Sequence, residues 1–150
     1  MIKGLNYIHE RQIIHLDLKP QNIMMRSRKD QFHIKLIDFG LAKRLHRGRV
    51  KTGFVGTVGF MAPEIAKAQY SGHEQDFATT ATDIFSLGVV VYMLLSGGLE
   101  PFWEGNDVRA IKNTLRREVT FDHSAFYGVS NEAKDFMKSK FNQDYENFDL

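Results

Sequence analysis

Apolar residues recur along the chain with the spacing of helices in four places. The four predicted helices cover residues 1–11, 82–95, 108–117 and 131–141. In the first, Ile2, Leu5 and Ile8 fall on one face of a helix. The second is apolar nearly all round, which is typical of a helix in the middle of a domain, and two glycines follow to end it. The last begins after Ser130, which is a suitable N-cap.

Shorter apolar runs predict strands around a polar loop. Residues 12–14 lead into the segment 15–22, and residues 23–25 lead out of it. Pro20 keeps this segment out of a helix. Residues 26–30 form a charged tip between two apolar runs and predict a hairpin connection, with a second strand at residues 33–37.

Composition narrows the class of protein. The 150 residues fit one compact domain, and 43% apolar with 25% charged residues is typical of soluble globular proteins. A net charge of +2 is too small to argue for nucleic acid as a partner, and we expect none. Cysteine is absent, which excludes disulfides and thiolate metal sites. No apolar run reaches the ~20 residues of a membrane span and no signal peptide is present, so we expect a cytoplasmic protein without membrane contact.

Residues 41–59 have a loop-like pattern with several glycines. A basic cluster lies within them, consisting of Lys43, Arg44, Arg47, Arg49 and Lys51. Two interpretations stay open: a solvated loop, or a surface that meets an acidic substrate or an acidic regulatory segment.

Three motifs follow one another in a fixed order. Residues 15–22 read His-Leu-Asp-Leu-Lys-Pro-Gln-Asn, residues 38–40 read Asp-Phe-Gly after an apolar strand, and residues 62–64 read Ala-Pro-Glu. Their order and spacing resemble the catalytic loop, the DFG motif and the APE motif of eukaryotic protein kinases. A lysine two residues after the aspartate is typical of serine/threonine kinases. His-Leu-Asp-Leu-Lys-Pro resembles the branch of myosin light chain, titin/twitchin and death-associated kinases.

The resemblance implies a fold as well. It predicts a mainly α (α+β) structure, the C-terminal lobe of a kinase with short β-hairpins at the catalytic loop, and no N-lobe. Residues 1–140 would be a partial kinase domain and residues 141–150 a divergent tail. No G-x-G-x-x-G sequence, the phosphate-covering loop of kinases, occurs in the chain.

The resemblance also assigns roles in phosphoryl transfer. Asp17 would orient the substrate hydroxyl and accept its proton, and Lys19 would meet the transferring phosphate. Asn22 and Asp38 would hold Mg²⁺, which favours oxygen ligands. Met24 would contribute to the ATP site. Taken singly, Asp38 could equally cap a turn and Asn22 could satisfy loop backbone; the joint spacing favours the site.

Other residues are assigned structural or regulatory roles by the same resemblance. His15 would pack under the catalytic loop against Phe39, and Asp83 would hold the loop backbone. Gly40 gives its segment freedom to swing. Thr57 would lie near Asp17 and Lys19, and Glu64 would pair with a distant arginine.

Four departures from the family pattern modify these expectations. Leu16 replaces the usual arginine, which makes activation by loop phosphorylation unfavourable. Gln21 and the pair Val58-Gly59 replace residues connected with substrate preference. The expected Asp-Pro-x-x-Arg run is missing from residues 141–150, so Glu64 would lack its arginine.

Three interpretations follow for the chain. The first is a serine/threonine kinase that uses ATP and Mg²⁺ on protein substrates, here a fragment with very little activity alone. The second is a non-catalytic interaction module, and the third is an incomplete product. Regulation by a C-terminal segment or a calmodulin-type protein, and a cytoskeletal setting, follow by analogy only.

Overall fold

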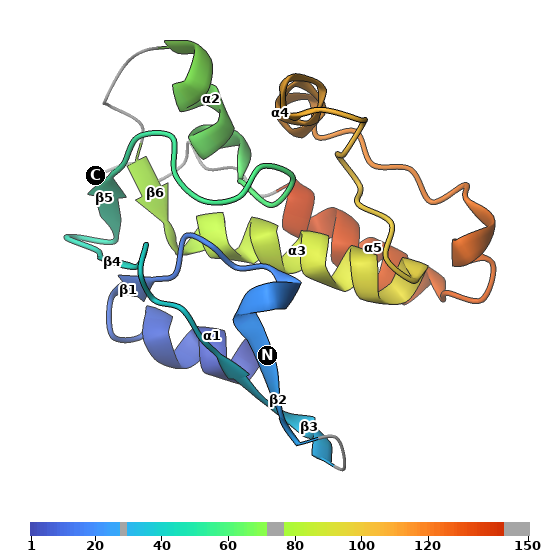
Figure 1. Ribbon diagram of the computed structural model, residues 1–150, viewed down its shortest axis with the longest axis horizontal. Helices are drawn as coiled ribbons and strands as arrows, with labels where there is room; N and C mark the ends of the chain where they lie inside the picture. Colours follow the sequence, from blue (N-terminus) through green and yellow to red (C-terminus); the bar gives the residue numbers. More distant parts are fainter. Residues whose placement is uncertain (28–29, 72–76, 143–150) are drawn as a thin grey trace.

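The structure is a computed structural model that describes residues 1–27, 30–71 and 77–142. The described residues form five α-helices, two 3-10 helices and six short strands. Figure 1 shows the helix α3 (Thr80–Ser96) running through the middle, with the other elements around it. The expectation of a mainly helical α+β fold with short β-hairpins agrees with this arrangement.

Helix α3 begins and ends where its sequence requires. The Thr79 side chain accepts a hydrogen bond from the first turn, and Thr82 bonds back to the Thr79 backbone, which makes a capping box. Gly97 ends the helix in the left-handed conformation, with φ 72°. The predicted helix at residues 82–95 is confirmed and extends slightly at both ends.

The largest part of the core lies between α3 and α5 (Asn131–Phe141). Phe141, the last residue of α5, is 1% exposed and contacts the rings of Phe85 and Phe102 edge-on. Gly88 allows this close approach, since a Cβ there would come within 2.9 Å of the Lys140 Cβ. Ser130 caps α5 by accepting from the Ala133 amide, as the sequence predicted. The core therefore continues one residue past position 140.

Helix α1 (Ile2–His9) packs against the polar loop of residues 15–22. Leu5 and Ile8 pack with Leu18 of that loop and with Leu87 of α3. Ile2, which was expected on the same buried face, is 59% exposed. The helix therefore buries a narrower stripe than its spacing predicted.

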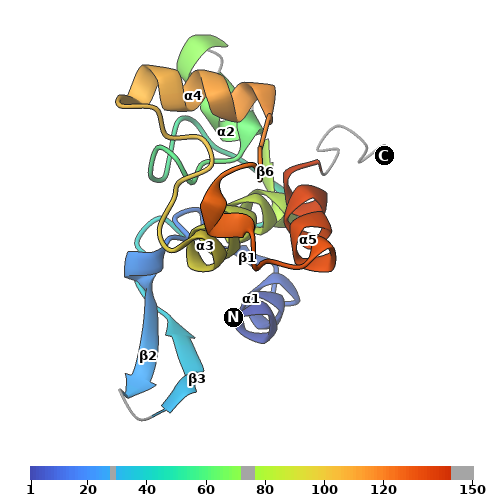
Figure 2. The same ribbon diagram turned by 90° about the vertical axis from the view of Figure 1, so that its right-hand side faces the viewer.

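The strands pair in three two-stranded antiparallel sheets. β1 (Ile13–Ile14) pairs with β4 (Lys43–Arg44), and β5 (Arg49–Lys51) pairs with β6 (Phe77–Thr79). β2 (Ile23–Ser27) and β3 (Asp30–Leu36) form the predicted hairpin, although two residues of its expected tip, 28–29, lie outside the described residues. Figure 2 shows this hairpin projecting from the helices.

One further expectation about local structure was wrong, and one helix was missed. Residues 41–59 were predicted as loop but contain β4 and β5, because each strand pairs with a distant segment instead of a neighbouring one. Helix α2 (Pro63–Ser71) was not predicted; it begins at the proline of the third motif, a residue suited to a first helical turn. Helix α4 (Asp107–Arg116) agrees with its prediction and is capped by Asn106.

Among the described residues, no helix has the length and apolar character needed to cross a membrane. The predicted tail overlaps residues 143–150, which lie outside the described part of the chain.

Candidate active site

The polar loop between β1 and β2 is fixed by a buried carboxylate of α3. Asp83 is 1% exposed and accepts backbone hydrogen bonds from His15 at 2.8 Å and from Leu16 at 2.9 Å. Its Oδ2 also lies 2.8 Å from Nε2 of His9, at the end of α1. Leu16 has φ 66°, a left-handed backbone that is costly for a branched residue. The Asp83 carboxylate stabilises this conformation because it takes both amides at once.

His15 is fully buried, and both of its ring nitrogens have partners. Nε2 donates to the carbonyl of Ile37 at 3.0 Å, and Nδ1 accepts from the Asp17 amide at 3.3 Å. Its ring lies against Phe39, with the centroids 4.9 Å apart. His15 therefore connects the polar loop to the segment around Phe39, and neither nitrogen is left for chemistry.

Asp17 is the centre of a second cluster, made of side chains. Its Oδ1 accepts from the Thr57 hydroxyl at 2.6 Å, and its Oδ2 lies 2.9 Å from Nζ of Lys19. The amide of Asn22 donates to Oδ2 at 3.1 Å and to the Asp17 carbonyl at 2.8 Å. Lys19 also donates to Thr57, at 2.8 Å. Four residues that the sequence singled out thus meet at one carboxylate.

The environment of Asp17 keeps its carboxyl ionised. Burial acts to raise its pKa, but the hydrogen bond and charge of Lys19 and the hydrogen bonds of Thr57 and Asn22 oppose burial. The net result is a pKa below the ordinary value of 3.8. At neutral pH the group is a carboxylate that can accept a proton or orient a hydroxyl.

Asn22 and Asp38 are brought together by the backbone of the β2–β3 hairpin. The Ile37 amide donates to the Asn22 carbonyl at 2.9 Å, so Asp38 follows directly beside Asn22. Asp38 has φ 58°, and its Oδ1 accepts from the Gly40 amide at 3.2 Å. Strained backbone of this kind is concentrated at functional sites.

This pair fits a magnesium ion. The Asn22 side chain makes both of its hydrogen bonds to described residues through the amide nitrogen, which leaves the amide oxygen for a cation. Asp38 is exposed and adds a carboxylate oxygen. No cluster of three or more histidine, cysteine or acidic residues suited to a metal occurs among the residues described. Mg²⁺ does not need one, because it is commonly held by one or two carboxylates together with water and phosphate oxygens.

The segment after β5 lies close against the polar loop at Gly56, where there is no room for a side chain. Gly56 has φ 100°, and a Cβ there would lie 2.6 Å from the carbonyl oxygen of Leu16. The Leu16 side chain is 7% exposed and packs with Leu45, Met61 and other apolar residues. The position that usually holds arginine thus joins the two segments through apolar contacts.

The remaining predicted residues are more dispersed. The Oε1 atom of Glu64 accepts from the Thr82 hydroxyl at 2.7 Å, and Glu64 is half-buried at the start of α2. Met24 is 54% exposed on β2 and Phe39 is 43% exposed. Gln21 is exposed, and Gly59, with φ 91°, lies close to the Glu100 carboxylate.

The sequence patterns did not reveal two residues that hold the site in place. His9 lies 74 positions before its partner Asp83. The only sequence signal for it was its place at the end of a predicted helix, one turn after the apolar residue Leu5. Gly56 was noted only as one loop glycine among several, although it alone meets the Leu16 carbonyl. The position of Gly56 directly before Thr57, a predicted site residue, was the available signal.

Comparison with known proteins identifies the family of the chain. The model of the protein kinase domain family matches residues 1–147. The chain belongs to the protein kinase family. Among curated relatives, myosin light chain kinase 3 of Danio rerio is 45% identical over 91% of this chain, and smooth-muscle myosin light chain kinase of Gallus gallus is 43% identical over 95%. Myosin light chain kinase family member 4 of Mus musculus is 43% identical over 90% of this chain.

The kinase chain spans a small part of these relatives. It covers 18% of the Danio rerio protein, 7% of the Gallus gallus protein and 33% of the Mus musculus protein. The resemblance of the three motifs to protein kinases is confirmed, and the light chain kinase branch indicated by residues 15–20 agrees with the names of these relatives. The relatives are much longer proteins, and their activities and substrates belong to those whole proteins.

Proposed function

We propose that this chain is the C-terminal lobe of a protein serine/threonine kinase, and that it transfers the γ-phosphate of ATP to protein hydroxyls when the rest of a kinase domain surrounds it. The observation that carries the proposal is the Asp17 carboxylate, held ionised by three side chains beside an amide–carboxylate pair suited to Mg²⁺. An interaction module has no physical need for that combination.

Each residue of the cluster has a task in this proposal. Asp17 orients the acceptor hydroxyl and takes its proton as the new oxygen–phosphorus bond forms and the bond to ADP breaks. Lys19 offsets negative charge on the transferring phosphate. Thr57 holds both side chains in place, since its hydroxyl contacts Asp17 and Lys19.

Asn22 and Asp38 are the residues that would hold Mg²⁺, and Met24 is the residue that we assign to the nucleotide. When bound, Mg²⁺ supplies positive charge that neutralises phosphate oxygens. His15, Phe39 and Asp83 position these groups without taking part in the reaction. Gly40 shapes the turn after Asp38.

The chain supplies no glycine-rich phosphate loop, so we propose that residues 1–150 alone have very little kinase activity. The light chain kinase relatives make a protein substrate, a cytoplasmic or cytoskeletal setting and a calmodulin-type regulator the natural proposals for the complete protein. Phosphorylation of the segment 41–61 is not its switch in this proposal, because Leu16 occupies a position that would otherwise bind phosphate through arginine.

A chimera tests the proposal. Residues 1–141 replace the matching segment of the Mus musculus relative, and transfer of labelled phosphate to a serine peptide is measured in Mg-ATP. We expect activity in the chimera, a loss of at least ~100-fold in Asp17→Asn, and a comparable loss in Asp38→Asn. Asp122→Asn, an exposed carboxylate away from the site, is the matched control and should leave the rate unchanged.

Two results would contradict the proposal. A folded chimera without phosphoryl transfer would leave the interaction module as the better interpretation. An Asp17→Asn chimera as active as its parent would remove Asp17 from the reaction.

A further inference from the structure

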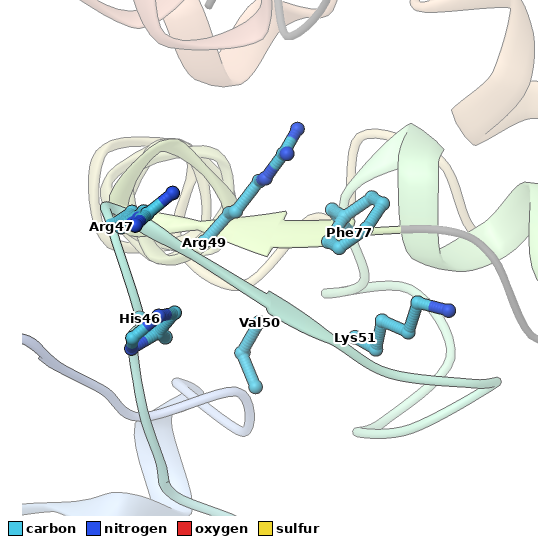
Figure 3. A pocket seen from close by; sticks show the side chains of 6 residues that line it. All are labelled: His46, Arg47, Arg49, Val50, Lys51 and Phe77. Carbon is cyan, nitrogen blue, oxygen red and sulfur yellow. The ribbon is translucent and has the colours of Figure 1, made fainter. Parts of the chain in front are cut away.

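A basic groove lies at β5 and the turn before it, beside Phe77, the first residue of β6. Its walls are formed by His46, Arg47, Arg49, Val50, Lys51 and Phe77, and its volume is about 360 Å³. Figure 3 shows the three cationic side chains following the strand, with the Phe77 ring between Arg49 and Lys51. We use the name basic groove for these six residues.

The geometry of the groove is set by the backbone and by one ring. The His46 amide donates to the Arg49 carbonyl at 2.8 Å, and the Arg49 amide donates back at 3.3 Å. Arg47 and Gly48 complete this tight turn with φ 52° and 78°. The Arg49 guanidinium lies over the Phe77 ring, 4.6 Å from its centroid, and the Lys51 ammonium lies 6.0 Å from it. These contacts hold two cations beside one apolar surface.

The positive charge of the groove is uncompensated within the described part of the chain. Arg47, Arg49 and Lys51 are exposed, and none of them forms an ion pair with a described carboxylate. By contrast, Lys19 is paired with Asp17 and Lys138 with Asp135. Like charges placed side by side repel each other, so an anionic ligand would be favoured here.

We propose that the basic groove binds an extended, acidic segment of a partner protein, with carboxylates against the arginines and an apolar side chain against Phe77. Its volume lies within the roughly 300–1,000 Å³ of ligand clefts, which suits a few side chains of a peptide. A nucleic acid is less favoured, because the chain's net charge is only +2 and the groove offers one aromatic ring for stacking. The proposal does not depend on phosphoryl transfer.

Direct binding tests it. A fluorescein-labelled decapeptide of Glu and Asp with one central Phe is titrated with the full 150-residue chain at low salt, and anisotropy is recorded. We expect saturable binding that weakens with salt. The double substitution Arg47→Gln/Arg49→Gln should weaken it by about tenfold or more, because it removes two charges that face the ligand. Phe77→Leu should weaken binding of this peptide but not of a peptide with Gly in place of the central Phe.

The controls separate a site from general attraction. Lys3→Gln/Lys35→Gln removes the same charge from exposed positions on α1 and β3 and should leave the affinity within about twofold. Circular dichroism should report unchanged helix content in every variant. Equal losses in both double variants, or no saturation with the parent chain, overturn the proposal.

Two further results would contradict the proposed partner and identify another occupant of the groove. Tighter binding of a single-stranded oligonucleotide than of the peptide would identify the groove as a nucleic-acid site. Residues 143–150 carry Asp144, Glu146 and Asp149. If a chain ending at residue 142 binds the peptide about tenfold more tightly than the full chain, the chain's own tail occupies the groove and the external partner is excluded.

Discussion

Asp17 and Asp83 are both largely buried aspartates with three hydrogen-bonding neighbours, yet their surroundings differ in one respect. Asp83 takes two backbone amides and one histidine, all fixed by the fold. Asp17 takes a hydroxyl, an ammonium and an amide, all on side chains that can rotate. A carboxylate bound by backbone stabilises structure, whereas one bound by side chains can exchange its partners for a ligand. The same functional group thus has a structural role in one region, and in the other it has the exchangeable partners that the role proposed for Asp17 requires.

The largest expected effect comes from deleting the structural carboxylate. Asp83→Ala leaves two buried amides and His9 without their acceptor, and we expect a loss of about 3–5 kcal/mol in the free energy of unfolding. Asp17→Ala should lose only about 1 kcal/mol, because water can reach its former partners. Urea unfolding followed by circular dichroism measures both. Similar losses in the two variants would break the comparison.

Gly56→Ala should have the second-largest effect. The new Cβ meets the Leu16 carbonyl oxygen at 2.6 Å in a backbone of positive φ, so we expect a loss of about 2 kcal/mol. Gly53→Ala is the matched control, since no atom lies within 4 Å of its Cβ position, and it should change stability by less than about 0.5 kcal/mol. If Gly56→Ala is as stable as Gly53→Ala, the segment does not dock on the loop as described.

The smallest effect concerns the ionisation of Asp17. Because its folded pKa is lower than its unfolded one, Asp17 stabilises the fold at pH values above about 4, and this contribution is lost as pH falls through the folded pKa. Lys19→Met removes one hydrogen bond and one charge, and burial then acts with less opposition, so the pKa of Asp17 should rise.

Carboxyl ¹³C NMR titration measures that pKa directly. Lys35→Met, on the exposed face of β3, should leave the value unchanged. An unchanged pKa in Lys19→Met would mean that the ion pair with Lys19 does not hold Asp17 ionised.

The sequence predicted what depends on neighbours along the chain. The helix at residues 131–141 has its cap and its apolar spacing in one stretch, and it agrees with the structure residue for residue. Asp17, Lys19 and Asn22 fall within six positions, so their meeting followed from a single loop. The contact of Thr57 with Asp17, 40 positions apart, came from the resemblance and from no local pattern.

What escaped prediction depends on distant partners. β4 is two residues long and β5 is three, so neither can show the alternation of apolar and polar residues that predicts a strand. They form because β4 pairs with β1 and β5 pairs with β6. Helix α2 carries a weak apolar stripe after Pro63 and is held by its neighbours. His9 and Asp83 meet only after α1 and α3 have packed.

The burial of Leu16 also determines which conditions can loosen the site. Where Leu16 meets the segment 41–61 the contacts are apolar and have no charge for salt to screen, whereas Thr57 joins the same segment to Asp17 and Lys19 through polar hydrogen bonds. Apolar contacts weaken on cooling, whereas ion pairs do not share this dependence. Temperature is therefore the variable to which the Leu16 contacts respond most directly.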